Sequence, residues 1–469
     1  MKGRMQKISA YANDCPQIDR TESEWYGGVQ TFMWMTDDNI VEVPFDKERL
    51  FELILSPSNL DKAYKAVVSN KECGGMDKMS CEQLFPWFLA NKDELIISLQ
   101  NGTYHPNPVR RVEISKDNGK NRLLGIPTVV DRLVVQQAIH QVLTPIYERQ
   151  FSMTSYGFRS KRGCHDALRR AQKIVDDGYR YVVDLDLERF FDTVSHGKLI
   201  EILSRTIKDG RVVSLIPKYL CSGVMNRGLF ETSTEGTPQG GPLSPLLSNI
   251  MLDELDKELE RRGHPFVRYA DDAMIFCKSK RTVQRVKESI TRFIEGQLFL
   301  KVNREKTVVS YVQEVNFLGY SFYVMKGKCL LTVHPQSKSK MKSKLKELTS
   351  RSNGCGYECR KQKLKEYIRG WVGYYHLAHI KRLCLETDEW LRRRIRMCIW
   401  KSWKPPKAKV ANLKRCGVHD WQAYQWGNTR LGYWRVVCSW ILTSTMSNDK
   451  LRKAGYVNLM DYYLEWHPK

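Results

Sequence analysis

The chain has 469 residues, with 76 Lys and Arg against 52 Asp and Glu, which gives a formal net charge of +24. This excess favours a polyanionic partner, above all nucleic acid, over a small acidic metabolite. A content of 42% hydrophobic and 11% aromatic residues excludes a disordered basic tail, and no apolar run is long enough to predict a membrane-spanning helix. The 13 cysteines form no CxxC pair, which favours reduced thiols and a cytoplasmic protein.

The amino-terminal part divides at about residue 45. Residues 1–45 show no sustained helical or strand period, so we expect an extension to which the pattern assigns no regular structure. From Phe51 the apolar spacing predicts two helices, with the segment Ser56-Pro57-Ser58-Asn59 between them. Ser58 or Asn59 is expected to cap the second helix.

The centre of the chain alternates strand and helix patterns, and Asn118-Gly119 is a strong turn signal because both positions tolerate positive φ. In chain order the patterns predict a hairpin over 110–126, a helix over 130–147, a strand over 181–187, a helix after 195, a helix over 243–262, strands over 266–269 and 273–277, a helix over 282–295, and mostly helices after 331.

Positive charge concentrates late in the chain. Residues 326–415 hold 25 Lys and Arg against six Asp and Glu, interleaved with aromatic residues such as Trp371, Tyr375 and Trp400. Cations neutralise phosphates, and aromatic rings stack on unpaired bases. This segment is therefore expected to bind structured RNA, although part of its aromatic content is expected to form core.

Carboxylates gather at two predicted strand ends. Asp184 and Asp186 are two apart on one strand, so they share a face. Asp271 and Asp272 lie at the tip of a predicted tight hairpin, and a rigid Gly/Pro segment over 236–245 opens a helix nearby in sequence. Mg²⁺ prefers such oxygen ligands, and two ions held this way serve nucleotidyl transfer.

Several ordered motifs resemble one family. Tyr269-Ala-Asp-Asp272 resembles the YxDD box of reverse transcriptases, and Gly236-Thr-Pro-Gln-Gly-Gly-Pro-Leu-Ser-Pro245 is similar to the QGxxxSP motif of the group II intron lineage. Tyr156-Gly-Phe-Arg159 resembles a finger motif of that lineage, and Ile368-Arg-Gly-Trp371 with residues 392–404 resembles its maturase, or X, domain. The chain is identified as a member of the bacterial group II intron-encoded reverse transcriptase/maturases, of the type lacking the HNH endonuclease domain.

The resemblance implies an α+β fold, a right-hand polymerase with fingers and palm, a helical thumb/maturase X domain and a small basic carboxy-terminal domain. The implied boundaries are 1–45 for the extension, 46–330 for fingers and palm, 331–405 for the thumb/maturase domain and 406–469 for the DNA-binding domain.

The resemblance also implies functional residues. The catalytic residues, which would hold two Mg²⁺ ions or Mn²⁺ in their place, are Asp186, Asp271 and Asp272. Those implied to bind the nucleotide are Lys116, Arg122, Phe191, Gln239 and Lys306, with Phe191 as the steric gate that selects dNTPs. The basic residues best suited to contact RNA are Arg392, Arg393, Arg394, Arg396, Lys401 and Lys404.

The implied function is an RNA-directed DNA polymerase that binds its group II intron RNA, assists splicing and copies that RNA into DNA during retrohoming. Its partners would be the intron RNA, the DNA target and primer strand, and dNTPs, in the bacterial cytoplasm and on the nucleoid when bound to DNA, without a membrane. Three alternatives stay open: a domesticated reverse transcriptase in repair or phage defence, a splicing-only maturase, and an RNA-templated RNA polymerase, against which Ala270 and Phe191 argue.

One further cluster has spacings that loosely suggest a zinc site: Cys355, Cys359, His376 and His379. A helical apolar stripe that includes Ile368, Trp371 and Val372 runs into the histidines, and it favours a packed helix over a metal site.

Overall fold

The computed structural model describes residues 30–36, 39–45, 49–115, 119 and 121–467. The chain forms two compact units. Unit 1 runs from the first described residue to Ile174 and from Gly178 to Ser310, and unit 2 comprises Val175–Asp177 and the described residues from Tyr311 onward. No helix within the described residues combines the length and apolar character needed to cross a membrane.

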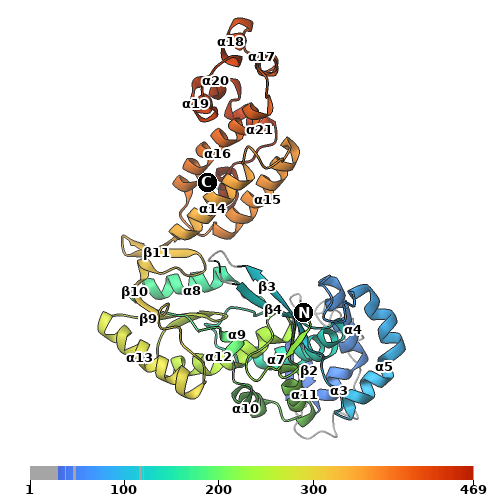
Figure 1. The fold of residues 1–469 in the computed structure, drawn as a ribbon. Helices are drawn as coiled ribbons and strands as arrows, with labels where there is room; N and C mark the ends of the chain where they lie inside the picture. The colour runs from blue at the N-terminus through green and yellow to red at the C-terminus, as the bar shows by residue number, and fades with distance from the viewer. Residues whose placement is uncertain (1–29, 37–38, 46–48, 116–118, 120, 468–469) are drawn as a thin grey trace, which may run out of the picture. The chain divides into compact units, whose positions relative to one another are not determined.

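Unit 1 mixes helices with two four-stranded sheets and one hairpin (Figure 1). In chain order, with the last residues of α8 and β10 crossing the unit boundary, its elements are β1 (Gln30–Thr36), β2 (Asn39–Phe45), α3 (Leu50–Leu55), α4 (Pro57–Ser69), the 3₁₀ turn η1 (Cys81–Gln83), α5 (Leu84–Gln100), β3 (Val109–Ser115), β4 (Asn121–Ile126), α6 (Val129–Asp131), the π-helical segment η2 (Arg132–Ala138), α7 (Ile139–Glu148), α8 (Cys164–Asp176), β5 (Tyr181–Leu185), α9 (Phe190–Thr193), α10 (His196–Thr206), α11 (Gly210–Leu220), β6 (Val224–Asn226), β7 (Leu229–Glu231), α12 (Leu243–Arg261), β8 (Phe266–Tyr269), β9 (Asp272–Cys277), α13 (Lys280–Gln297) and β10 (Val308–Tyr311).

The expected strands and helices of the centre are confirmed, but the expected cap of the second helix is wrong. The segment 1–45 contains the antiparallel hairpin β1–β2, in which Gln30 pairs with Phe45 and Thr36 with Asn39. Ser56, rather than Ser58 or Asn59, caps α4, since its hydroxyl accepts the backbone N–H of Asn59 and Pro57 fills the first helical position.

Two sheets position the site in unit 1. One has the strand order β10-β5-β9-β8, with β5 and β8 both antiparallel to β9. The other has the order β4-β3-β6-β7, and its pairing of β3 with β6 is parallel, with Val109 opposite Val224. Residues more than a hundred positions apart are thus brought into one sheet.

The core of unit 1 lies against one face of the β5–β9 pair. Val183, Leu185 and Ile275 are buried in one hydrophobic cluster together with leucines of α12. Because side chains alternate along a strand, the neighbouring residues on β5 and β9 face the other way. That alternation leaves Asp184 on the opposite face.

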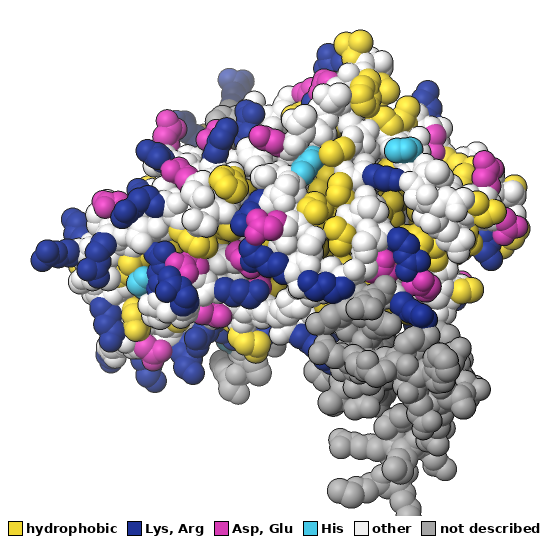
Figure 2. Space-filling view, turned by 90° about the horizontal axis from the view of Figure 1, so that it is seen from below, with side chains coloured by type: hydrophobic (Ala, Val, Ile, Leu, Met, Phe, Trp, Pro, Cys, Tyr) yellow, Lys and Arg dark blue, Asp and Glu magenta, His cyan; other side chains and the backbone are white. Residues whose placement is uncertain are grey.

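Helix α13 carries its charge on one side. Val286, Ile290 and Ile294 are buried, while Arg281 and Arg285 are exposed. In the space-filling view, Lys and Arg side chains gather toward the left, the side on which Figure 1 places α13 (Figure 2). The spacing is that of an amphipathic helix with a solvated basic face.

Unit 2 begins with a strand pair and continues as helices. Its elements are the 3₁₀ turn η3 (Val312–Glu314), β11 (Tyr320–Met325), β12 (Lys328–Val333), α14 (Pro335–Leu348), α15 (Tyr357–Tyr375), α16 (Lys381–Ser402), α17 (Pro406–Arg415), α18 (Asp420–Gly427), α19 (Tyr433–Cys438), α20 (Trp440–Thr445), α21 (Asn448–Lys453) and α22 (Leu459–Trp466). A second hydrophobic cluster, which includes Trp400, Leu413 and Val436, joins α16 to the helices after it.

Candidate active site

The strand register brings the predicted carboxylates together. Leu185 of β5 pairs with Ala273 of β9, and Asp184 pairs with Met274. Continuing this antiparallel register by one residue sets Asp186 beside Asp272, on the same face as Asp184. Asp271 precedes Asp272 in the turn between β8 and β9, so the residues predicted to be catalytic lie at one end of one sheet.

The electrostatics of these residues reflect their crowding. The side chain of Asp272 reaches solvent, but the surrounding protein desolvates its carboxyl group, and this desolvation together with the charges of Asp271, Asp184 and Asp186 raises the pKa of Asp272 to about 7. Desolvation and the charge of Asp186 raise the pKa of Asp184 to about 6. The site therefore holds more negative charge than its cations balance.

Asp186 is fixed by a loop that follows α13. The hydroxyl of Thr307 lies 3.2 Å from both the backbone nitrogen and the backbone oxygen of Asp186, and the N–H of Asn303 donates to the same oxygen at 2.9 Å. The Lys306 ammonium lies 3.1 Å from Oδ2 of Asp186. Asn303 and Thr307 thus hold the backbone of Asp186 through local hydrogen bonds, and Lys306 lies beside its carboxylate.

The turn that carries Asp271 and Asp272 depends on a buried arginine. Arg268 is 1% exposed, and its guanidinium donates to Asp256 and Asn249 of α12 and, at 3.0 Å, to the carbonyl of Ala270. Ala270 has a φ of +58°, a left-handed conformation that is unusual for a residue with a side chain. The bond from Arg268 holds the turn in that conformation.

A glycine packs against the same turn. A Cβ on Gly157 would lie 2.2 Å from the backbone nitrogen of Ala270, and the Gly157 carbonyl accepts a hydrogen bond from Asn249 at 2.9 Å. The finger motif that contains Gly157 thus supports the turn directly. Sequence reasoning missed Arg268, Asn249 and Gly157 as supporting residues; the available signal for Arg268 was a charged residue inside an apolar strand.

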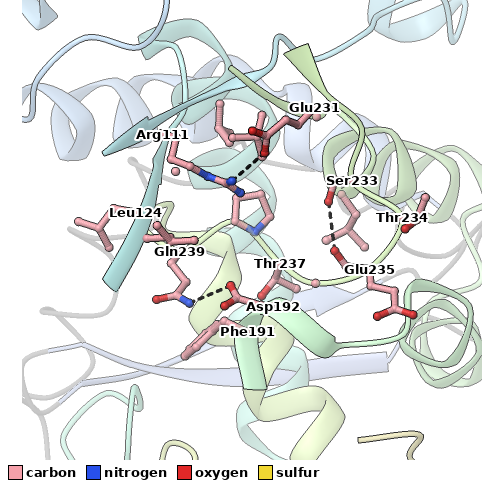
Figure 3. A pocket seen from close by; sticks show the side chains of 18 of the residues that line it. Arg111, Leu124, Phe191, Asp192, Glu231, Ser233, Thr234, Glu235, Thr237 and Gln239 are labelled. Atoms are coloured by element: carbon pink, nitrogen blue, oxygen red, sulfur yellow. Dashed lines mark hydrogen bonds and ion pairs between the residues drawn. The ribbon is translucent and has the colours of Figure 1, made fainter. Parts of the chain in front are cut away.

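A pocket of about 350 Å³ lies in unit 1 beside α9 and the Gly/Pro segment (Figure 3). Phe191 and Gln239 line it, and Gln239 donates to Asp192 at 3.2 Å. Across the pocket, Arg111 of β3 forms an ion pair with Glu231 of β7 at 2.7 Å. Figure 3 shows Phe191, Asp192 and Gln239 at one end of this hollow and the Arg111–Glu231 pair at the other.

Backbone bonds hold the segment with Gln239 in place. The carbonyl of Gln239 accepts a hydrogen bond from the N–H of Gly125 on β4 at 2.7 Å. The N–H of Thr237 donates to the carbonyl of Phe191 at 2.6 Å. The sheet β4-β3-β6-β7, α9 and the loop before α12 therefore form one framework around the pocket. Two predicted nucleotide contacts stand apart: Lys116 lies outside the described residues, and Arg122 is described only by its backbone pairing with Ile114 in β3–β4.

The geometry bears on whether the carboxylates can hold a metal. Among the described residues, no three His, Cys, Asp or Glu side chains already form a metal-ligand set. Asp186 is instead turned to Lys306. The donor chemistry still fits a hard cation, since Asp186, Asp271 and Asp272 offer only carboxylate oxygens, and desolvation together with the neighbouring carboxylates raises the pKa of Asp272.

The predicted RNA-contact residues of α16 differ in their accessibility. Arg396 is 5% exposed, with its guanidinium donating to the carbonyl of Met446 and to Asn448, so the expectation that Arg396 contacts RNA is wrong. Its spacing places it on the inner face of α16, where it joins α16 to Met446 and to the first residue of α21. Arg394 donates to Thr349 at 2.6 Å and is partly buried.

The other predicted contacts reach solvent to different degrees. Arg392 and Lys401 are half-buried, Arg393 forms an ion pair with Glu389, and Lys404 is exposed. In the cluster weighed as a zinc site, His376 stacks on Trp466 with ring centroids 4.1 Å apart. The sulfurs of Cys355 and Cys359 lie 2.8 Å from each other.

Comparison with known proteins decides the family. Residues 114–322 match the family described as reverse transcriptase (RNA-dependent DNA polymerase), and residues 338–417 match the group II intron, maturase-specific domain. The chain is 35% identical over 314 residues to protein YkfC of Escherichia coli, which covers 58% of this chain and 82% of that protein. It is 34% identical over 359 residues to the group II intron-encoded protein LtrA of Lactococcus lactis, which covers 62% of this chain.

The chain belongs to the group II intron reverse transcriptase and maturase family. It spans 59% of the length of LtrA. Among solved structures, a chain of a Cas6-RT-Cas1–Cas2 complex matches 53% of this chain and 43% of its own length, with 26% identity and a TM-score of 0.35. In this reverse transcriptase and maturase, the carboxylates and Lys306 lie within the matched polymerase region, and Arg392 to Lys404 lie within the matched maturase region.

Proposed function

We propose that this reverse transcriptase copies its own intron RNA into DNA during retrohoming, through nucleotidyl transfer assisted by two divalent ions. The observation that carries the proposal is the convergence of Asp186, Asp271 and Asp272 at one end of the β5–β9 pair. The same unit holds the pocket lined by Phe191 and Gln239. A carboxylate set of this kind and a nucleotide-sized pocket are the parts that strand extension requires.

Asp186, Asp271 and Asp272 would hold two Mg²⁺ ions, with Mn²⁺ able to replace them. Bound ions of this kind activate a primer 3′-hydroxyl and neutralise charge on the leaving pyrophosphate. The raised pKa of Asp272 supports this assignment, because a site crowded with carboxylates gains most from a cation. Lys306 neutralises part of the charge on Asp186 and would hold an oxygen of the leaving group.

The pocket residues would select and orient the nucleotide. The Phe191 ring would occupy the space that a ribose 2′-hydroxyl requires and so favour dNTPs over rNTPs. Gln239, held by Asp192 and by the backbone of Gly125, would lie beside the templating base pair. Lys116 and Arg122 would bind the triphosphate through charge-assisted hydrogen bonds.

Unit 2 would bind the intron RNA and assist its splicing, while the DNA target and the primer strand complete the set of partners. Among the predicted contacts, Lys404 is exposed, and Arg392, Arg393 and Lys401 reach solvent in part. Their phosphate contacts would make RNA affinity fall with rising salt. The proposed place of action is the bacterial cytoplasm, on the nucleoid when DNA is bound.

The test is primer extension on an RNA template with Mg²⁺, with dNTPs and rNTPs compared. The wild type is expected to extend with dNTPs, and the double variant Asp271→Asn with Asp272→Asn is expected to lose extension. Asp449→Asn, an exposed aspartate of α21, is the matched control and should extend as the wild type does. Extension that survives in the double variant would overturn the assignment of the carboxylates.

Splicing separates the proposal from its rivals. The double variant should still accelerate splicing of the intron RNA, because its substitutions lie in unit 1 and leave unit 2 unchanged. A wild-type chain that splices but never extends a primer would be a splicing-only maturase. One that extends a primer but neither binds nor splices the intron would be a domesticated reverse transcriptase.

A further inference from the structure

Unit 2 contains a cavity of about 1060 Å³, and of the predicted RNA contacts on and after α16 its lining includes Arg394. It is bordered by the last turns of α14, by Arg394 and Met397 of α16, and by residues 432–435 at the start of α19. Helix α16 packs against both α14 and α19 (Figure 1). The cavity is at the upper end of the volumes typical of ligand sites, about 300–1,000 Å³.

The lining of this cavity is cationic. Among its lining residues, the four cations are Lys346, Arg351, Arg394 and Arg435. Glu347, which also lines it, is already bound to Lys344, with Nζ–Oε1 at 2.8 Å. The cavity therefore presents a net positive charge to whatever enters it.

Two aromatic rings stand among these cations. The Tyr433 ring lies under the guanidinium of Arg351, whose Cζ is 5.0 Å from the ring centroid. Trp434, the next residue, also lines the cavity and is 43% exposed. The following residues, Val436 and Val437, are fully buried in the core of unit 2, so they anchor α19 while Trp434 keeps its ring in solvent.

One wall of the cavity is rigid. The Arg394 guanidinium donates to the carbonyls of Lys346 and Thr349, each at 3.0 Å, and to the hydroxyl of Thr349. These bonds join α16 to the end of α14 and leave the cavity's shape independent of a ligand. A preformed site binds with less loss of conformational entropy than a flexible one.

We propose that this cavity binds an unpaired nucleotide of RNA, with its base stacked on Trp434 and its phosphate held by Arg435 and Arg351. The proposal rests on the RNA-binding function proposed above and extends it to residues beyond the matched maturase region, which ends at 417. Cations neutralise phosphate, and an exposed ring between them stacks on a base.

The chemistry favours an unpaired nucleotide over a duplex. A ring stacks on the face of a base, and that face is available only where the base has left its helical stack. Most of the cavity's lining, including Arg351 and Arg394, lies in the region matched to the maturase-specific domain, which favours RNA over DNA. An unpaired loop or bulge of the intron RNA meets both requirements.

The test uses the full chain and a fluorescein-labelled single-stranded RNA of twelve nucleotides carrying 4-thiouridine. Trp434→Ala should weaken binding by about tenfold, since base stacking on an aromatic ring is worth about 1–3 kcal/mol. Trp434→Phe should restore most of the affinity, because it keeps an aromatic ring. Irradiation should crosslink the RNA to a peptide that contains Trp434 in the wild type.

The matched control is Trp421→Ala, which removes another exposed tryptophan of unit 2, on α18, that does not line the cavity. It should bind RNA as the wild type does. Equal losses for Trp421→Ala and Trp434→Ala, or no loss for either, would overturn the proposal. The proposal would also be overturned if Trp434→Ala weakened binding of the same sequence as duplex RNA, or as single-stranded DNA, by the same factor.

The result also separates this inference from the function on which it rests. A wild-type chain that binds no RNA would refute the proposed function and this site together. A wild type that binds RNA tightly and crosslinks only at residues 401–404, which do not line the cavity, would refute the cavity site and leave the proposed function intact.

Discussion

Arg268 and Asp256 form an ion pair closed to solvent behind the turn that carries Asp271 and Asp272, with Arg268 Nε 2.8 Å from Asp256 Oδ1 and side chains that are 1% and 0% exposed. The same guanidinium donates to the carbonyl of Ala270 and so holds this residue in its left-handed conformation. The pair therefore links the stability of unit 1 to the position of Asp271 and Asp272.

Replacing Arg268 with Met should lower the free energy of unfolding by about 3–5 kcal/mol, because it leaves the Asp256 carboxylate buried without its partner. Urea unfolding measures this loss. Arg304→Met, which breaks the exposed pair with Glu295, should cost less than about 1 kcal/mol. A further change, Asp256→Leu in the Arg268→Met background, should recover stability but not primer extension, since Ala270 still lacks its donor. Equal losses for Arg268→Met and Arg304→Met would contradict this account.

Gly157→Ala should disable the polymerase. The added Cβ would meet the backbone nitrogen of Ala270 at 2.2 Å, and backbone cannot move aside without displacing Asp271 and Asp272. Misplacing reacting groups by about 1 Å costs roughly a hundredfold in rate. Steady-state primer extension measures kcat for this variant. Gly197→Ala, in α10 with open space around it, is the control and should leave kcat unchanged; a Gly157→Ala enzyme with wild-type kcat would refute the role of Gly157.

The carboxylate site could be predicted from sequence because its signals are local. Asp184 and Asp186 alternate along a strand, and Asp271-Asp272 sits between two short apolar strands, so the register follows from few assumptions. The Arg268–Asp256 pair joins a strand to a helix, and a charged residue in a strand is as readily assigned to solvent as to the core. The parallel pairing of Val109 with Val224 depends on contacts across more than a hundred residues.

The basic cluster on α16 also shows a limit of prediction from sequence, because the pattern does not show which of its arginines face the core. Arg392 to Arg396 reads as one charged run, yet a helix turns about 100° per residue, so its members face different ways. Arg396 faces inward and joins Met446 and Asn448, while Arg393 faces a glutamate on the surface. Composition indicated an RNA-binding segment correctly in kind, but only packing decides which arginines are free to bind.

Phe191→Val should relax sugar selection. Phe191 lines the pocket beside Gln239, with its ring 5.3 Å from that of Phe190, and a smaller side chain opens space for a 2′-hydroxyl. The ratio of kcat/KM for dNTP over rNTP should fall by about 10–100-fold, mainly through faster rNTP incorporation. Single-nucleotide incorporation with each substrate measures the ratio. Phe299→Val, an exposed phenylalanine that does not line the pocket, should leave it unchanged; an unchanged ratio for Phe191→Val would exclude Phe191 as the gate.

Asp388 gives unit 2 a pH-dependent stability. It is 1% exposed in α16 and accepts the N–H groups of Leu459 and Met460 at the start of α22, at 2.8 and 2.9 Å. Burial raises the pKa of Asp388 to about 6, although these two hydrogen bonds oppose the shift. An unfolded aspartate titrates near about 4, so between about pH 4 and 6 the folded chain binds more protons than the unfolded chain. The free energy of unfolding must then fall as the pH rises through this window.

Asp388→Asn removes the titrating group and should remove that dependence, which amounts to at most about 3 kcal/mol between pH 4 and 6. Urea unfolding of the full chain at pH 4.5, 5.5 and 6.5 measures it, and the wild type should lose stability across this series relative to Asp388→Asn. Asp449→Asn, an exposed aspartate of α21, should keep the wild-type slope. Parallel slopes for the wild type and Asp388→Asn would show that the Asp388 carboxyl titrates normally, and that the contact between α16 and α22 does not respond to pH.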